Sequence, residues 1–354
     1  MDMLADKLGM DPFEFRLMNS LRPGQSKSTG RVVDQWCFPE LMEAMRPHYE
    51  RAVIEAKGHR DGRVKHGVGL GTGAFGVGGP GDGSVAAVEL DRDGGISVYA
   101  AAADPGEGND SMLSQLTAAF MGIPLEKVRL FTRDTDNTAA SGPAAGSRIT
   151  YMIGGALING LEQLKTAMQE TGARTSEELE AASKSKRYLG AKKNEDAGPL
   201  DPLTGQGPSF ESQVHAVQLV ELEVDTETGQ VSIRKMTTSV DAGPVIHPQN
   251  LTGQLEGGMD MGVGFALREE YVAGKTRDWV TFKFPTIRNS FEMETVIRET
   301  PRPKGPLGAT GVGEMCMVPT APAVINAIKN ATGVWICDLP ATPEKILAAL
   351  SLKK

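Results

Sequence analysis

The sequence predicts an α+β protein in which two similar units, each a β-hairpin followed by a glycine-rich turn and a helix, pack around a shared cleft. One pattern occurs twice. The chain first runs from the hairpin VELDRDGGISVY (88–99) to DPG at 104–106, and later from the hairpin VELEVDTETGQVSI (220–233) to DAG at 241–243. A glycine-rich helix start follows each time, so the two units are expected to be alike. Many of the 42 glycines also gather in short loops, a pattern typical of backbone that wraps a ligand.

Composition fits a soluble globular protein with a core, because 40% of the 354 residues are hydrophobic and 23% are charged. The net charge of −8 argues against a nucleic-acid surface. No apolar run is long enough to cross a bilayer, and the N-terminus lacks the basic-then-apolar pattern of a signal peptide. A cytoplasmic location without membrane contact is therefore expected.

Three segments are predicted: a helical linker (1–65), a first unit (66–205) and a second unit (206–354). The linker contains two short helices broken at Asp11–Pro12 and a longer helix over 38–57. In the first unit, strands at 85–90 and 96–100 precede an amphipathic helix, a strand at 128–131 and a long helix from Ile149. Residues 171–210 are polar and predict a solvated helix and a loop. A loose G-x-G-x-x-G within 71–83 follows no strand–turn–helix pattern and is a weak dinucleotide signal.

The second unit begins with strands at 217–224 and 231–236, and the glycine-rich stretch 253–267 follows them. Near its end, an apolar helix begins at Thr320 and stops at Gly333, and a last short helix runs through Leu350.

One carboxylate lies in a glycine loop just before that apolar helix. Gly308, Gly311 and Gly313 lead to Glu314, which leaves the backbone free to approach a ligand closely. From the spacing alone, an exposed loop glutamate is the more ordinary interpretation.

A second candidate site is the SGPAAGSR segment at 141–148, where Ser147 and Arg148 precede a helix. Backbone N–H groups, a hydroxyl and a guanidinium at a helix start suit an anion. An N-cap serine beside a surface arginine explains the same residues equally well.

The chain shows no metal-ligand spacing of its own. Its five His are scattered, and Cys37, Cys316 and Cys337 are not paired at cluster or zinc spacing. The inventory of backbone N–H groups, a Ser–Arg pair, a glutamine and a loop glutamate fits a large anionic cofactor that brings its own metal.

Five motifs resemble those of the molybdenum hydroxylases, the xanthine dehydrogenase and aldehyde oxidoreductase family: PGEG (105–108), SGPAAGSR (141–148), GQLEGG (253–258), GATGVGE (308–314) and LPATPEKIL (339–347). The resemblance covers nearly the whole chain and is nearest to the aldehyde oxidoreductases of anaerobic bacteria. Residues 1–20 are similar to a linker well inside the family's longer catalytic subunit, so this chain is expected to lack the part that precedes it.

The resemblance implies a shared cofactor cleft that holds molybdenum on a molybdopterin in the cytosine dinucleotide form. It makes Glu314 the catalytic base. It assigns the cofactor contacts to Gly106, Glu107, Gly108, Gly146, Ser147, Arg148, Gln254, Val312 and Gly313. Glu107 departs from the family, where glutamine is commoner, and it adds a negative charge near an anionic cofactor.

The implied activity is oxidation of an aldehyde to a carboxylic acid, in which the glutamate takes the proton of a hydroxyl group on molybdenum. Hydride passes to the molybdenum centre, and electrons leave through iron–sulfur clusters on a partner that can also carry FAD. The N-terminal half of the molybdopterin subunit is the other implied partner. A xanthine dehydrogenase-type hydroxylase of a heteroaromatic substrate and a non-catalytic remnant that binds a partner are the alternatives.

Overall fold

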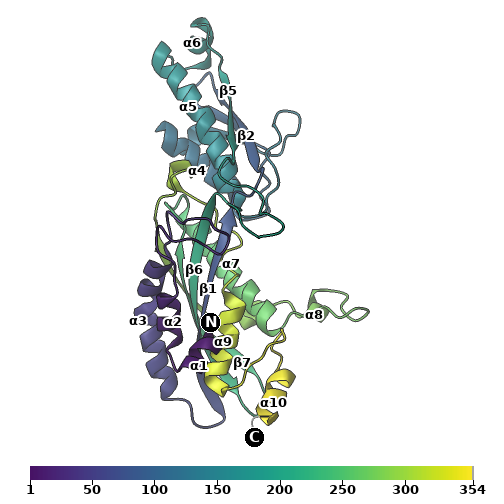
Figure 1. Ribbon diagram of the computed structural model, residues 1–354. Coiled ribbons are helices and arrows are strands. Elements are labelled where there is room, and N and C mark those ends of the chain that lie inside the picture. The colour runs from purple at the N-terminus through teal and green to yellow at the C-terminus, as the bar shows by residue number, and fades with distance from the viewer. Residues whose placement is uncertain (353–354) are drawn as a thin grey trace.

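The structure is a computed structural model that describes residues 1–352, and it places two α+β units end to end in an elongated molecule (Figure 1). Each unit contains one four-stranded sheet, which confirms the predicted fold class. Among the described residues, no helix is long and apolar enough to span a lipid bilayer.

The first sheet has the strand order β4-β3-β2-β5. Its strands are β2 (Gly83–Leu90), β3 (Ile96–Tyr99), β4 (Val128–Phe131) and β5 (Arg187–Lys193). β2 and β3 form the predicted antiparallel hairpin, and β4 pairs with β3 in parallel. Helix α4 (Asn109–Met121) connects β3 to β4, and α5 (Gly154–Thr171) packs on β2 and β5. Leu113, Leu116 and Leu157 are fully buried in the core between these helices and the sheet.

The second sheet has the order β1-β6-β7-β8. Its strands are β1 (Val64–Val77), β6 (Ser212–Asp225), β7 (Val231–Asp241) and β8 (Glu292–Arg298). β6 and β7 form the second predicted hairpin, and β8 pairs with β7 in parallel. Helix α7 (Pro248–Leu267) lies in the chain between β7 and β8, and α9 (Thr320–Thr332) packs on β1 and β6. Val220, Met259 and Ile328 are buried where the two helices meet this sheet.

The two sheets correspond strand by strand, but their fourth strands come from different parts of the chain. β5 follows α5 within the first unit, whereas β1 precedes that unit and pairs antiparallel with β6 from Val64–Asp225 to Val77–Ser212. Residues 64–77 therefore belong to the second sheet, which differs from the predicted division that put 66–205 in one unit. The local sequence pattern carries no information about which strand residues 64–77 pair with.

Alternating glycines on β1 let helix α9 lie directly on the strand. A Cβ at Gly67, Gly69 or Gly71 would overlap backbone carbonyl oxygens of α9 or of the residue before it. Successive strand residues face opposite sides, so these three glycines, two residues apart, all face the helix. The weak G-x-G-x-x-G signal lies within this strand, where its glycines make room for neighbouring residues. In the first unit, Gly190 of β5 allows α5 to approach in the same way.

The N-terminal segment contains helices α1 (Asp2–Leu8), α2 (Pro12–Met18) and α3 (Phe38–Lys57), and α3 packs on the other face of the second sheet. The predicted break holds, because the Asp11 carboxylate caps α2 by accepting from the Phe13 backbone N–H at 2.8 Å. Leu41, Met42 and Met45 of α3 are buried against Leu70 and Leu219 of the sheet.

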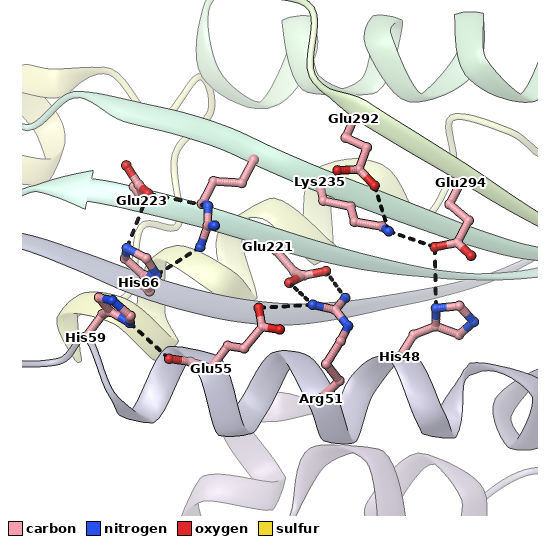
Figure 2. Close-up of polar contacts among 11 residues, drawn as sticks. His48, Arg51, Glu55, His59, His66, Glu221, Glu223, Lys235, Glu292 and Glu294 are labelled. Atoms are coloured by element: carbon pink, nitrogen blue, oxygen red, sulfur yellow. Dashed lines mark hydrogen bonds and ion pairs between the residues drawn. The ribbon is translucent and has the colours of Figure 1, made fainter.

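A network of charges joins the outer part of α3 to the same sheet (Figure 2). Arg51 binds both oxygens of the buried Glu221 carboxylate, at 2.5 and 3.0 Å. His48 lies 3.4 Å from the Glu294 carboxylate, which also pairs with Lys235 at 2.9 Å. The helix is therefore fixed both by apolar packing and by paired charges.

Two elements differ from the sequence prediction. Strand β5 lies in a region predicted as helix and loop, and the long helix begins with one π-helical turn (Ile149–Ile153) before α5. β5 is an edge strand with the charged sequence RYLGAKK, of which only Gly190 is buried. The remaining helices are α6 (Ser176–Ala181), α8 (Trp279–Phe282) and α10 (Pro343–Leu352), with 3-10 turns at Leu125–Lys127, Ile287–Asn289 and Pro306–Gly308.

A buried polar cluster lies where β6 pairs with β7. His215 is 2% exposed, faces Asp241 across the strands, and packs edge-on against Trp36. Neither ring nitrogen has a hydrogen-bond partner within the described part of the chain. Burial, together with the charges of Arg302 and Lys27, lowers the pKa of His215 to about 3, so the ring is neutral at neutral pH.

Gly69→Ala is expected to destabilise the chain by about 2 kcal/mol or more, because the added methyl group overlaps backbone of α9 that cannot move alone. Chemical denaturation would measure the change. Gly257→Ala in α7 is the control, since no atom lies within 4 Å of the added Cβ. It should leave stability unchanged or raise it by up to about 1 kcal/mol. Equal stability of the two variants would contradict the packing argument.

His215 should make folding sensitive to mild acid. Its pKa is lower in the folded chain than the ordinary value of about 6.5 in the unfolded chain, so below pH 6.5 the unfolded state binds more protons and stability falls. Between pH 7.5 and pH 5 the loss from this residue should reach about 2 kcal/mol. Urea unfolding across this range should show a weaker pH dependence for His215→Leu than for the parent chain. Parallel pH profiles would contradict the assignment.

Candidate functional site

Four segments that are distant in sequence wall one cavity of about 480 Å³ between the two units. They are the loop before α4 (106–109), the turn before α5 (144–150), the segment leading into α7 (242–254) and the loop at 309–314. Three carry predicted glycine motifs, and the third segment ends at the predicted Gln254. Of the predicted site residues, all but Gly146 line this cavity, and the Gly146 backbone contacts Glu314 directly.

The first loop is shaped by Asp104. Its carboxylate accepts from the backbone N–H groups of Gly106, Gly108 and Asp110 at 3.0 to 3.1 Å. Burial acts to raise the pKa of Asp104, but these donors outweigh it and hold the pKa below its usual value. Gly106 and Gly108 have φ of 132° and 88°, which favour glycine. The Glu107 carboxylate accepts from Asn109 Nδ2 at 2.7 Å, so this unusual residue has a partner within the loop.

The second loop is fixed by Arg148, which is 5% exposed. All three nitrogens of its guanidinium donate to the protein. Nε donates to both oxygens of Asp82 at 3.0 Å, Nη1 to the carbonyls of Ser141 and Pro143 at 2.7 and 3.1 Å, and Nη2 to the Gly83 carbonyl and Ser84 Oγ at 2.9 and 2.6 Å. The side chain thus holds its own loop in place, and its predicted contact with an anion stays a prediction.

The second and fourth loops meet at Glu314. The Gly146 N–H donates to Glu314 Oε1 at 2.6 Å, and the Ser147 hydroxyl donates to Oε2. In return, the Glu314 backbone N–H donates to Ser147 Oγ at 3.0 Å. Ser147 adopts a left-handed φ of 52°, a conformation that a non-glycine residue adopts only at an energetic cost. The predicted Glu and the predicted Gly-Ser pair therefore lie together and hydrogen-bond across the junction of the units.

The fourth loop is also anchored to α7 and to its own following turn. Gln254 Nε2 donates to the Gly313 carbonyl at 3.1 Å, and the Cys316 thiol donates to the same oxygen at 2.7 Å. Burial raises the pKa of Cys316 to about 11, so the thiol stays protonated at neutral pH. This supports a structural role for Cys316. Val312 is 8% exposed and packs in a small core between the units.

Sequence reasoning missed three residues that also line the cavity: His247, Asn250 and Thr310. His247 caps α7, because its Nδ1 accepts from the Asn250 backbone N–H at 3.3 Å. Asn250 packs so tightly on Gly108 that any Cβ there would overlap its amide. The segment PVIHPQN contains no glycine, so a search by glycine density passed over it. Thr310 is the one hydroxyl residue in the predicted motif GATGVGE, and that position could have identified it.

The cavity suits a large polar cofactor. Its volume falls in the usual range for ligand sites, and a second, open cavity of about 610 Å³ adjoins it and shares Gly106, Glu107, Asn250 and Gln254. Thr310 Oγ1 is buried in its wall without a partner in the described residues, which leaves a hydrogen bond available to a ligand. Arg148 is the one Lys or Arg among the described lining residues, and its guanidinium is bonded to protein groups. An anionic ligand would therefore depend on backbone N–H groups. Across residues 1–352, no group of three His, Cys, Asp or Glu side chains is arranged to bind a metal ion.

Two repeated α+β units with glycine loops converging on one cavity are an arrangement that suits a cofactor-binding protein. The chain belongs to the molybdopterin cofactor-binding domain family, whose model matches residues 41–290. The relationship to the molybdenum hydroxylases predicted from the sequence is thereby confirmed.

Individual relatives agree with this family. The aldehyde oxidoreductase of Megalodesulfovibrio gigas is 38% identical over 99% of this chain and 40% of its own length. The xanthine dehydrogenase molybdenum-binding subunit of Escherichia coli O157:H7 is 29% identical over 98% of this chain and 50% of its own length. The solved aldehyde oxidoreductase from Desulfovibrio gigas superposes with a TM-score of 0.95, covering 99% of this chain and 40% of that one. The chain thus spans about half or less of the length of these relatives.

Gly311→Ala should separate the second and fourth loops, because a Cβ at Gly311 would overlap the Ser147 carbonyl oxygen. Hydrogen exchange of the amides in 141–148 and 311–314 is expected to accelerate at least tenfold. Gly253→Ala, which meets no atom within 4 Å, should leave these amides unchanged. Normal protection in the Gly311 variant would show that the loops do not depend on this close approach.

Proposed function

We propose that this chain is the molybdopterin-binding portion of a molybdenum hydroxylase that oxidises an aldehyde to a carboxylic acid. The observation that carries the proposal is the convergence of four loops on one cavity, with the Glu314 carboxylate held in its wall by Gly146 and Ser147. The aldehyde substrate class rests on the 38% identity to an aldehyde oxidoreductase, compared with 29% to a xanthine dehydrogenase subunit.

The cofactor is proposed to be a molybdopterin in the cytosine dinucleotide form. Gly106, Gly108 and Gly313 would offer backbone to its polar edges, while the free hydroxyl of Thr310 and the amide of Gln254 would bind its ring system. Asn109 donates to the Glu107 carboxylate, which would restrain this negative charge when an anionic cofactor binds. When bound, the cofactor supplies the molybdenum centre that accepts two electrons from the substrate.

Glu314 is proposed to be the general base that takes a proton during the attack on the substrate carbon. The Gly146 N–H and the Ser147 hydroxyl fix the orientation of its carboxylate. Neighbouring residues exclude water from one side, since Met315 and Cys316 behind the loop are buried. A fixed and partly dry carboxylate needs little reorganisation when the proton arrives.

The proposal includes partners that supply what these residues do not. The relatives are about two to two and a half times as long, so a polypeptide equivalent to their remaining part would complete the cofactor enclosure. Electrons would leave through iron–sulfur clusters on another domain or chain, because the three cysteines are free and far apart in sequence.

Co-expression tests the proposed function. The chain would be purified alone and together with the polypeptide that corresponds to the uncovered part of its relatives, and molybdenum and pterin per chain would be measured. We expect one molybdenum per complex and little in the isolated chain. Aldehyde-dependent dye reduction, with a purine as comparison substrate, would then test the substrate class. A complex without molybdenum would refute cofactor binding, and purine oxidation alone would favour the xanthine dehydrogenase type.

Glu314→Gln should lower turnover by about 10² to 10⁴, the usual contribution of general-base catalysis, while molybdenum content stays at the parent level. Glutamine keeps the shape of the side chain but cannot accept the proton. Glu162→Gln, an identical change on the exposed side of α5, serves as the control for protein handling. Near-parent turnover of the Glu314 variant at full metal loading would exclude the assigned role.

A further inference from the structure

We infer that Asp82 is a positioning residue of the candidate site, and that it acts through Arg148 to hold Gly146 and Ser147 against Glu314. The inference deepens the proposed function and rests on it for the catalytic consequence. Asp82 lies just before β2 and does not line the cavity. Its carboxylate instead binds the guanidinium of Arg148 through both oxygens at 3.0 Å and through an ion pair with Nη2 at 2.7 Å.

The Arg148 guanidinium links the 141–148 loop to the start of β2, because it donates hydrogen bonds to both. Two of its acceptors belong to the loop (Ser141 and Pro143), and three belong to the β2 side (Asp82, Gly83 and Ser84). Asp82 is the one anionic acceptor in this set. The site is buried, so the charge of Arg148 depends on that carboxylate for compensation.

Further contacts hold the same loop against β2 and leave space for the guanidinium. Gly142 has φ of 83°, and a Cβ there would lie 2.7 Å from Arg148 Nη1, so only glycine leaves room for the guanidinium. Ser84 Oγ donates to the Ser141 carbonyl at 2.9 Å, and Ser141 Oγ donates to the Val85 carbonyl at 2.7 Å. The loop is thus closed on β2 at its first residue and at its last.

The closed loop sets the geometry at Glu314. Arg148 follows Ser147 directly, so fixing its backbone restrains the left-handed Ser147 and the preceding Gly146. These two residues supply both donors to the Glu314 carboxylate. When the junction loosens, Ser147 can relax to an ordinary backbone conformation, and the carboxylate loses its fixed orientation. The effect of Asp82 on the reaction is therefore indirect, through the direction of one carboxylate.

The first test is hydrogen exchange on the isolated chain, which needs no cofactor. In Asp82→Asn, the peptide that contains Gly146 should exchange at least tenfold faster than in the parent, while peptides from β6 and β7 stay protected. Arg63→Ala is the matched control, because it removes a surface Arg–Asp pair with Asp225 far from this loop. Unchanged exchange of the Gly146 peptide in Asp82→Asn would overturn the inference, whatever the cofactor proves to be.

The second test uses the assembled, metal-loaded enzyme. Asp82→Asn should lower kcat at least tenfold, with KM and molybdenum content near the parent values, because the base is misdirected and the cofactor contacts remain. Arg148→Ala should also lower kcat at least tenfold, and added guanidinium ion should restore both kcat and protection of the Gly146 peptide. Faster exchange with unchanged kcat, or failure of guanidinium to restore either quantity, would reduce the pair to a structural role and overturn the inference. A complex that never binds molybdenum would instead refute the proposed function and leave the exchange result standing.

Discussion

The contact between the loop before α5 and the loop that carries Glu314 is the constraint on which the rest of the site depends. It joins the two units where their backbones approach closely. Gly311 must be glycine because the Ser147 carbonyl lies against it, and Ser147 adopts a left-handed backbone to reach Glu314. Helix α7 supports the same junction from the other side through Gln254. The cavity is therefore a consequence of how the two sheets are joined.

Glycine has two physical roles in this chain. In β1 and β5, its missing side chain lets α9 and α5 lie against the strand backbone, which places both helices in equivalent positions on the two sheets. In the loops around the cavity, it permits left-handed backbone and leaves backbone polar groups uncovered. The first role stabilises the units, and the second creates the site. The same residue type thus gave one strong signal in the sequence with two separate causes.

Local patterns predicted most elements. The hairpins, α3 and α9 follow from periodicity and caps that lie within each segment, and the glycine loops identified three walls of the cavity. Features that depend on distant residues could not be predicted: the pairing of β1 with β6, the edge strand β5, and the burial of Arg148 against Asp82, 66 residues earlier. His247 and Asn250 were missed for a related reason, since their importance comes from the position of α7. The roles of Glu314 and the cofactor contacts remain proposals.

The placement of β1 has a consequence for synthesis of the chain. β1 ends at Val77, and its partner β6 begins at Ser212, 135 residues later (212 − 77). At about 5 to 20 residues per second, the ribosome needs on the order of 10 s to make that interval. The whole first sheet, from Gly83 to Lys193, emerges during this wait and can fold before β1 has a neighbour. For that time β1 lacks its partner strand β6, and its glycine face is not covered by α9, so its edge is open to pairing with other strands.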